Sequence, residues 1–221
     1  ENYALAFKET RKQNMEFLFF PLIIGVVVLV WFIAWVFKKA GKINKAAATK
    51  AGPRSFKEEL TFGFHLMFHP FDGFWDLKHE KRGSVRAATT ILGITIIAFF
   101  YQAIGQGYLF NPTGSYSTII TQLVGVGVPL LLFVISNWCL TTLFEGEGSF
   151  KDICIAVCYS LVPLPLLLVP ATIFSNVVTV NEMDIVTLLV SLGFIWAGFL
   201  IFFGTMVTHD YSLGKNVLMI V

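Results

Sequence analysis

Histidine and carboxylate side chains close together in the sequence are the first candidates for metal or acid–base chemistry. His65 and His69 lie four residues apart, so on a helix they would share one face, as metal ligands often do. Asp72, His79 or Glu80 would have to supply a further ligand. Zinc sites normally contain cysteine or a tighter set of histidines and carboxylates, whereas histidine also suits a membrane surface as an amphipathic side chain. We therefore predict no metal ion here.

Other patterns of catalytic residues are missing from the sequence. It contains no Walker loop, no nucleophile elbow and no glycine pattern of a dinucleotide site. Its three cysteines, Cys139, Cys154 and Cys158, lie in long apolar runs, where small polarizable side chains suit helix packing. The sequence predicts a protein that is not an enzyme, takes no cofactor and has no nucleic-acid partner.

The composition is that of an integral membrane protein, with 56% hydrophobic and only 14% charged residues. Five uncharged runs each exceed the roughly 20 residues that a helix needs to cross a bilayer: 17–37, 87–110, 115–144, 153–181 and 185–208. Because the backbone finds no water in the bilayer core, such runs must form helices or a closed barrel, and they show no period-two alternation. We predict an all-α polytopic transmembrane helical bundle with five complete spans, and expect the apolar run 216–221 to begin a sixth.

The basic residues predict the orientation. Residues 38–86 contain eleven of the sixteen Lys and Arg residues, which places this segment on the cytoplasmic side. The predicted organisation is an extracytoplasmic tail at 1–16 that continues from an upstream part, a transmembrane helix at 17–37, a basic cytoplasmic linker at 38–53, an amphipathic interfacial segment at 54–85, and a helical membrane domain at 86–221 that is truncated at its C-terminus.

The segment 54–85 is rich in aromatic residues at helical spacings beside charged ones. This pattern predicts a helix that lies in the membrane interface, broken into two pieces at Pro70 and Gly73. The same apolar stripe would also suit packing on another protein subunit. The candidate interfacial residues are Phe64, Phe68, Phe71, Phe74 and Trp75.

A short charged hairpin, EGEG at residues 145–148, separates the third and fourth runs. Its glycines permit a tight turn, Ser149 can cap the next helix, and Asp152 suits the positive end of that helix. The fourth run also contains Pro163, Pro165 and Pro170. Neighbouring helices or hydroxyl groups must satisfy the carbonyl groups that these prolines leave free, so we expect the fourth span to be kinked and surrounded by protein.

The run FEGEGSFKDICIAVCYSLVP at 144–163 is similar to the signature of the Yip (Ypt-interacting protein) domain family of polytopic membrane proteins, in which a glycine-containing hairpin with a Phe-Lys pair leads into a helix with Tyr-Ser-x-x-Pro. Residues 70–78, PFDGFWDLK, resemble the entry to the first helix of that domain, and the resemblance covers about residues 68–221. It carries over a motif with a structural or partner-binding role, made of Glu145, Gly146, Gly148, Phe150, Lys151, Tyr159, Ser160 and Pro163.

Eukaryotic members of this family are similar to one another in an Asp-Leu-Tyr/Trp-Gly-Pro motif and act with Rab GTPases, whereas this chain has HPFDGFWDLKHEKRG in its place. It therefore resembles the bacterial branch, whose members are often encoded beside carbohydrate ABC transporters. The resemblance implies a multi-pass protein of the bacterial plasma membrane, with its N-terminus outside.

The leading functional prediction is a non-enzymatic scaffold or accessory subunit that binds membrane lipids and another membrane protein complex, with ABC permease subunits as the best specific guess. Mild polar residues inside the spans, such as Gln122, Asn137 and Thr187, usually join helices to one another. They leave open a pore or carrier for a small neutral solute. A third hypothesis is a membrane-shaping or trafficking-type factor that acts through the aromatic segment.

Overall fold

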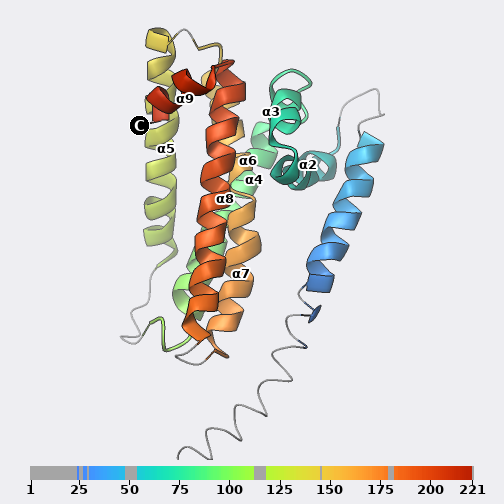
Figure 1. Cartoon of the computed structure of the whole chain (residues 1–221), viewed down its shortest axis with the longest axis vertical. Helices are drawn as coiled ribbons and strands as arrows, with labels where there is room; N and C mark the ends of the chain where they lie inside the picture. The colour runs from blue at the N-terminus through green and yellow to red at the C-terminus, as the bar shows by residue number, and fades with distance from the viewer. Residues whose placement is uncertain are drawn as a thin grey trace, which may run out of the picture. The chain divides into compact units, whose positions relative to one another are not determined.

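The computed structural model describes residues 24, 27, 28, 30–47, 54–111, 118–144, 146–178 and 182–220, and within these ranges every regular element is a helix (Figure 1). The chain divides into two compact units, residues 1–39 and 40–221. In the first unit, residues 30–39 are helical, as the predicted span at 17–37 requires for its second half. The tail at 1–16 lies outside the described residues.

The described part of the predicted basic linker at 38–53 is helical and partly buried. Residues 40–47 are helical, and Ala40, Asn44 and Ala47 are buried. Small side chains at these positions allow the helix to pack closely, which explains why a lysine-rich sequence still has a buried face. Residues 48–53 lie outside the described part of the chain.

Four helical segments of the described residues are long and apolar enough to cross a membrane. They are α4 (Val85–Gly105), the Ile119–Leu140 part of α5 (Ile119–Phe144), the pair α6 (Phe150–Ser160) and α7 (Pro163–Ser175), and α8 (Met183–His209). Each coincides with a predicted run, so the protein is a multi-pass helical membrane protein. The predicted total of five complete spans and the beginning of a sixth is not confirmed.

The run at 216–221, which we expected to begin a sixth span, follows a sharp turn at the end of α8. At Asp210 the backbone adopts the left-handed conformation, with φ 57° and ψ 39°, and the chain turns away from α8. The short helix α9 (Leu213–Ile220) then packs against α5 and α8. Asn216 is completely buried there and donates a hydrogen bond to the carbonyl oxygen of Phe202 at 2.8 Å. This contact fixes α9 on the last turns of α8.

The proline-containing span lies at the centre of the domain, as predicted. In its most apolar window 72% of the residues are buried, against 6% for α5. The span is broken where α6 ends at Ser160, and after two turn residues Pro163 occupies the first position of α7, where its missing N–H group costs no helical hydrogen bond. Because α7 packs on α4 and α8, this span forms the core around which the other spans are arranged.

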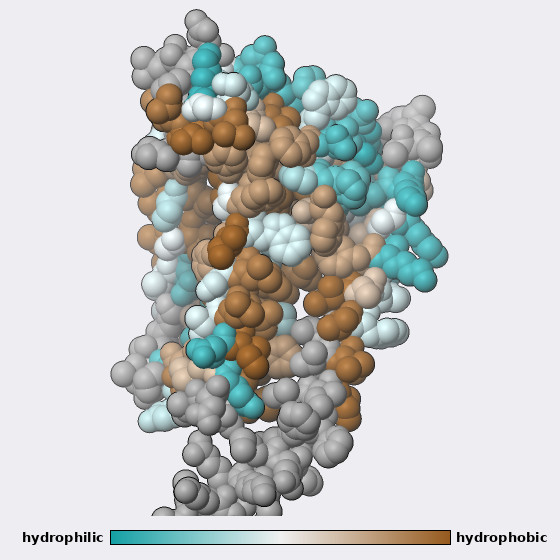
Figure 2. All heavy atoms as spheres, viewed as in Figure 1, coloured by the Kyte–Doolittle hydropathy of each residue, from teal (hydrophilic) through white to brown (hydrophobic). Residues whose placement is uncertain are grey.

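The amphipathic segment forms two helices that pack on the bundle, α2 (Phe56–Phe68) and α3 (Pro70–Lys78). The break lies at His69 and Pro70, and Gly73 is inside α3. The inner face of the pair is fully buried and includes Phe62 and Leu66. Figure 2 shows hydrophilic residues gathered mainly at the end of the molecule that carries α2 and α3, with apolar surface along the spans.

One aromatic residue of the predicted interfacial set belongs instead to the core. Phe74 is 1% exposed, and its ring occupies the space above Gly204 of α8, where an added Cβ atom would lie 2.9 Å from the ring. The helical spacing alone could not show that α8 has a gap at this position. Phe68, Phe71 and Trp75 remain about half exposed, as expected for interfacial residues, and Phe64 is partly buried.

Candidate functional site

The glycine hairpin at residues 146–149 packs directly on the end of α8. A Cβ atom at Gly146 would lie 2.3 Å from the Tyr211 hydroxyl oxygen and 2.6 Å from His209 Nδ1, and one at Gly148 would lie 2.8 Å from His209 Cε1. Real side chains do not tolerate such distances. The glycines are therefore required for close approach of the backbone to the His209 ring. Glu145, the first residue of the motif, lies outside the described residues.

His209 connects the hairpin to two helices. The Gly148 N–H group donates to His209 Nδ1 at 3.3 Å, and His209 Nε2 lies 2.7 Å from Asn137 Oδ1 in α5. Because Nδ1 accepts, Nε2 carries the proton and donates to Asn137, so the ring is neutral. His209 is 1% exposed, and its ring stacks on Tyr211 at a centroid distance of 4.9 Å. This buried contact holds α5, α8 and the hairpin together.

The remaining hairpin residues begin α6 as predicted. The Ser149 hydroxyl accepts a hydrogen bond from the Asp152 N–H group and caps the helix. The Phe150 ring contacts Trp138 of α5 edge to face at 6.0 Å. Lys151 is exposed, so of the motif residues described here it is one that remains available to a partner or to lipid phosphate.

The Tyr-Ser-x-x-Pro part of the motif lies at the junction of α6 and α7. Ser160 is fully buried and donates to the Ala156 carbonyl oxygen at 2.8 Å. Pro163 is also buried. Tyr159, likewise fully buried, donates through its hydroxyl group to the Glu59 carbonyl oxygen of α2 at 2.8 Å, across 100 residues of sequence. The motif therefore anchors α2 to the centre of the bundle.

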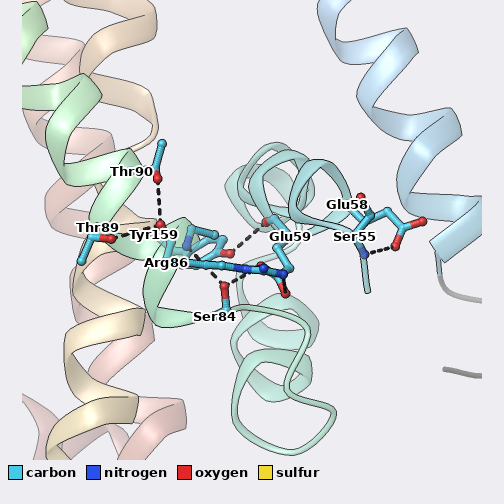
Figure 3. A network of polar contacts seen from close by, with 9 residues as sticks. Ser55, Glu58, Glu59, Ser84, Arg86, Thr89, Thr90 and Tyr159 are labelled. Carbon is cyan, nitrogen blue, oxygen red and sulfur yellow. Dashed lines mark hydrogen bonds and ion pairs between the residues drawn. The ribbon is translucent and has the colours of Figure 1, made fainter. Parts of the chain in front are cut away.

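The Glu59 carboxylate at the same place joins α2 to the start of α4 (Figure 3). Arg86, at the start of α4, contacts both oxygens of Glu59 at 3.1 Å through Nε and Nη2. The Ser84 hydroxyl donates to Glu59 Oε2 and accepts from the Ala87 N–H group as the cap of α4. Because its oxygens are occupied, Glu59 acts as a structural anion and not as a free base.

The environment of Glu59 has opposing effects on its pKa. Burial alone raises the pKa of a carboxyl group, but the hydrogen bonds from Arg86 and Ser84, with the positive charge of Arg86, outweigh it and hold the pKa of Glu59 below its ordinary value. The carboxylate is therefore ionised at neutral pH. An ionised group in this position keeps the start of α4 and the α2 helix in register.

A second ion pair closes the loop after α3. Arg82 contacts Asp76 Oδ2 at 2.7 Å, lies over the Phe62 ring at 4.5 Å and donates to the Asn44 carbonyl oxygen at 3.3 Å. Asn44 in turn donates to the Thr61 carbonyl oxygen at 3.1 Å. These contacts fix the buried part of the predicted linker against α2.

A cavity of about 400 Å³ opens between α3, the hairpin and the end of α8. Phe71 and Trp75 form its aromatic side, and Asp72, Lys78 and Asp210 are among its polar lining residues. Its size is within the range of small-molecule sites. The hairpin, through Glu147, and two of the exposed aromatic residues, Phe71 and Trp75, which are far apart in sequence, thus meet around one cavity.

The two histidines with metal-ligand spacing are part of a stack of rings. His65 and His69 are nearly parallel at a centroid distance of 4.8 Å, and burial lowers the pKa of His65, with a smaller effect of the neighbouring His69. Among the residues that the structure describes, no group of three or more His, Cys, Asp or Glu side chains could hold a metal ion.

Several residues of these contacts were not anticipated from the sequence. In the sequence, His209 lies at the end of the fifth apolar run, and Asn137 is a mild polar residue inside the third. Glu59 and Arg86 look like surface charges beside the membrane. A signal did exist for Arg86, because a basic residue at the start of an apolar run needs either the interface or an acidic partner. No local pattern could have shown which acid this is.

The apolar spans arranged around a central proline-broken helix, with the polar contacts gathered at one end, define a polytopic helical membrane protein. The profile described as the Yip1 domain matches residues 64–221. The chain therefore belongs to the Yip1 domain family. This match includes the last five residues of α2 and all of α3, so α3 and the end of α2 are part of the family domain. Searches of curated proteins and of solved structures found no match.

Proposed function

We propose that this chain is a membrane scaffold or accessory subunit, without catalytic activity, that docks laterally on another membrane protein complex. The observation that carries the proposal is the exposure of α5. Only 6% of its apolar window is buried, while its bonds through Asn137 and its packing on α6 hold it firmly in place. A well-anchored helix with most of its surface unused offers a rigid face to a partner.

Small residues on α5 favour a protein partner over lipid alone. Gly125 and Gly127 have no heavy atom within 4 Å of an added Cβ atom, so packing among the described residues does not require glycine at these positions. In membranes, where lipid tails are as apolar as leucine, helices associate through close backbone approach at small residues. The open space beside Gly125 and Gly127 would admit such a helix.

The buried polar groups support this proposal over a solute pore. The hydroxyl groups of Thr95, Ser160 and Thr172 each donate to a carbonyl oxygen four residues earlier in their own helix, at 2.8 to 2.9 Å. A hydroxyl that is satisfied in this way does not offer its proton to a passing solute. Uptake of a neutral solute by vesicles that contain the purified protein, above that of empty vesicles, would favour the pore instead.

The test of the scaffold proposal is capture of the partner from native membrane with a tagged full-length chain. In the variant Gly125→Leu no heavy atom of the described residues lies within 4 Å of the new Cβ atom, so the protein should fold normally and lose its partner. Gly198→Leu in α8 is the matched control, since Gly198 is equally open. Recovery of the chain alone in mild detergent, or equal capture by the Gly125→Leu variant, would contradict the proposal.

We propose a carbohydrate ABC transporter as the first partner to test, because the bacterial proteins that this chain resembles are often encoded beside such transporters. In that case the captured complex contains permease subunits, and the chain resides in the bacterial plasma membrane with residues 38–86 on the cytoplasmic side. Capture of an unrelated complex would remove this partner and leave lateral docking in place.

The aromatic surface of α2 and α3 supports a second candidate, a membrane-shaping factor. Phe68, Phe71 and Trp75 are each more than half exposed, as wedge-like side chains at headgroup level would be. Replacing these three and Phe64 with alanine should abolish any effect on vesicle curvature. An unchanged effect would exclude this segment from such a role.

A further inference from the structure

Four exposed lysine side chains near the start of α2 have no acidic partner. Three ion pairs lie in this region: Arg54–Glu80, Arg82–Asp76 and Arg86–Glu59. Within the described part of the chain, four other lysine side chains form no ion pair or hydrogen bond, although all are exposed: Lys42, Lys45, Lys57 and Lys81. We call these four residues the lysine surface.

The first two lysines are held outward by the opposite face of their helix. Ala40, Asn44 and Ala47 are buried, and at about 100° of rotation per residue they share one face, while Lys42 and Lys45 lie on the other side. Asn44 fixes this arrangement, because its side chain donates to the Thr61 carbonyl oxygen at 3.1 Å and its own carbonyl oxygen accepts from Arg82 at 3.3 Å. The charged side of this helix is therefore preorganised.

Contacts with α2 bring the other two lysines to the same region. The Thr61 hydroxyl group, beside Asn44, donates to the Lys57 carbonyl oxygen one turn earlier in α2 at 2.8 Å. The Arg54 guanidinium group donates to the Glu80 carbonyl oxygen at 2.9 Å, which holds the neighbouring Lys81 close to the beginning of α2. The lysine surface thus follows the first turns of this helix.

The local charge is strongly positive. Each ion pair of this region is neutral as a unit, and Glu58, which closes the capping box of α2, adds one negative charge. Four lysines and one glutamate give a net charge of +3. Positive charges that are fixed near one another raise the potential between them and favour an anionic partner.

The start of α2 lies at the level where α4 enters the membrane. Arg86 is the second residue of α4, and its guanidinium group contacts the Glu59 carboxylate of α2 (Figure 3). Phe56 lies 5.8 Å from the same guanidinium group and is 38% exposed. An exposed aromatic ring beside basic side chains suits the boundary between headgroups and acyl chains. A membrane surface therefore fits this region better than an acidic protein in the aqueous phase.

We propose that the lysine surface binds the headgroups of anionic phospholipids, with the Phe56 ring among the upper acyl carbons. Zwitterionic phospholipids also present a phosphate group, but their ammonium group cancels its charge. Anionic phospholipids alone complement the net positive charge, and basic residues near such a surface contribute additively to binding. The lysine surface lies on α2 and its neighbours and not on α5, so its loss leaves capture of a partner complex unchanged.

The test is lipid retention by the purified full-length protein, measured by native mass spectrometry in micelles with equal amounts of phosphatidylglycerol and phosphatidylethanolamine of identical acyl chains. The wild-type protein should retain phosphatidylglycerol preferentially. Lys42→Gln, Lys45→Gln and Lys57→Gln should each reduce this preference about fivefold, and the triple variant should retain the two lipids almost equally. Higher salt should also reduce the preference, because it screens exposed charges.

Two controls separate charge from folding. The triple variant with arginine at the same three positions keeps the charge and should keep the preference. Lys215→Gln removes an equally exposed lysine from α9 and should retain lipid as the wild type does. An undiminished preference in the triple glutamine variant would overturn the proposal. Equal retention of both lipids by the wild type would also overturn it, and would leave an acidic protein as the partner of these lysines.

Discussion

Replacing Gly148 by alanine tests whether close approach of the hairpin to His209 holds this end of the bundle together. The new Cβ atom would lie 2.8 Å from His209 Cε1, 2.9 Å from Nδ1 and 3.0 Å from Thr208 Cγ2. His209 and Thr208 are both buried, so neither can move into solvent. No positive φ is recorded for Gly148, and the substitution therefore probes steric fit and not backbone strain.

The expected magnitude follows from three contributions. Overpacking a filled site costs about 1–3 kcal/mol, and loss of the hydrogen bond from the Gly148 N–H group to His209 costs about 1 kcal/mol. Replacing glycine by alanine restricts the unfolded chain and returns about 0.4–1 kcal/mol. The net loss of stability is about 2 kcal/mol. For a chain of this length that corresponds to a fall in Tm of roughly 4–8 °C.

Thermal unfolding of the purified protein in detergent measures this effect. Gly125→Ala is the control, because no atom lies near its new Cβ atom, and its Tm should equal or slightly exceed that of the wild type. Removal of the histidine ring opens the space, so Gly148→Ala should cost much less in a His209→Ala background. A wild-type Tm for Gly148→Ala, or an equal penalty in both backgrounds, would refute the reasoning.

Three further predictions concern the contacts of α2 and α3. Tyr159→Phe removes the bond to the Glu59 carbonyl oxygen and should lower the free energy of unfolding by about 1 kcal/mol, seen in denaturant titrations; no change would mean that this bond does not hold α2. Because the pKa of Glu59 is lowered in the folded protein, its contribution to stability is complete above its ordinary pKa and is lost as the pH falls through the lowered value. Tm should therefore decrease on acidification below about pH 4.5, and Glu59→Gln should flatten this part of the curve; parallel curves would contradict the assignment. Glu147→Gln breaks only the exposed pair with Lys78 and should change Tm by less than about 2 °C, while a large fall would show that the pair is structural.

The positions of the spans were predictable because hydrophobic length in a bilayer is a strong local signal. The runs predicted at 87–110 and 185–208 correspond to α4 and α8 within a few residues at most boundaries. The buried position of the proline-containing span also followed from the sequence, since backbone groups freed by Pro163 and Pro170 need protein around them. The cap at Ser149 was visible in the spacing of polar residues before an apolar run.

The polar contacts at the hairpin end could not be predicted, because their partners are far apart in sequence. Glu59 and Arg86 are 27 residues apart, Asn137 and His209 are 72 apart, and Tyr159 lies 100 residues from Glu59. The sequence around a mild polar residue in a span does not show whether that residue faces lipid, a partner or a buried histidine. Phe74 was misplaced for the same reason, since the space that receives it is made by a glycine in α8.

The anchoring of α2 has a consequence for biogenesis. α2 is fixed by Tyr159 and by Trp196, whose indole N–H group donates to the Met67 carbonyl oxygen across 129 residues at 3.2 Å. At about 5–20 residues per second, the ribosome needs roughly 5–25 seconds to deliver these anchors after α2 emerges. During that interval the segment 54–78 lacks its contacts with α6 and α8. A nascent chain stalled before α8 should therefore leave this segment open to protease, and release of the stall should protect it.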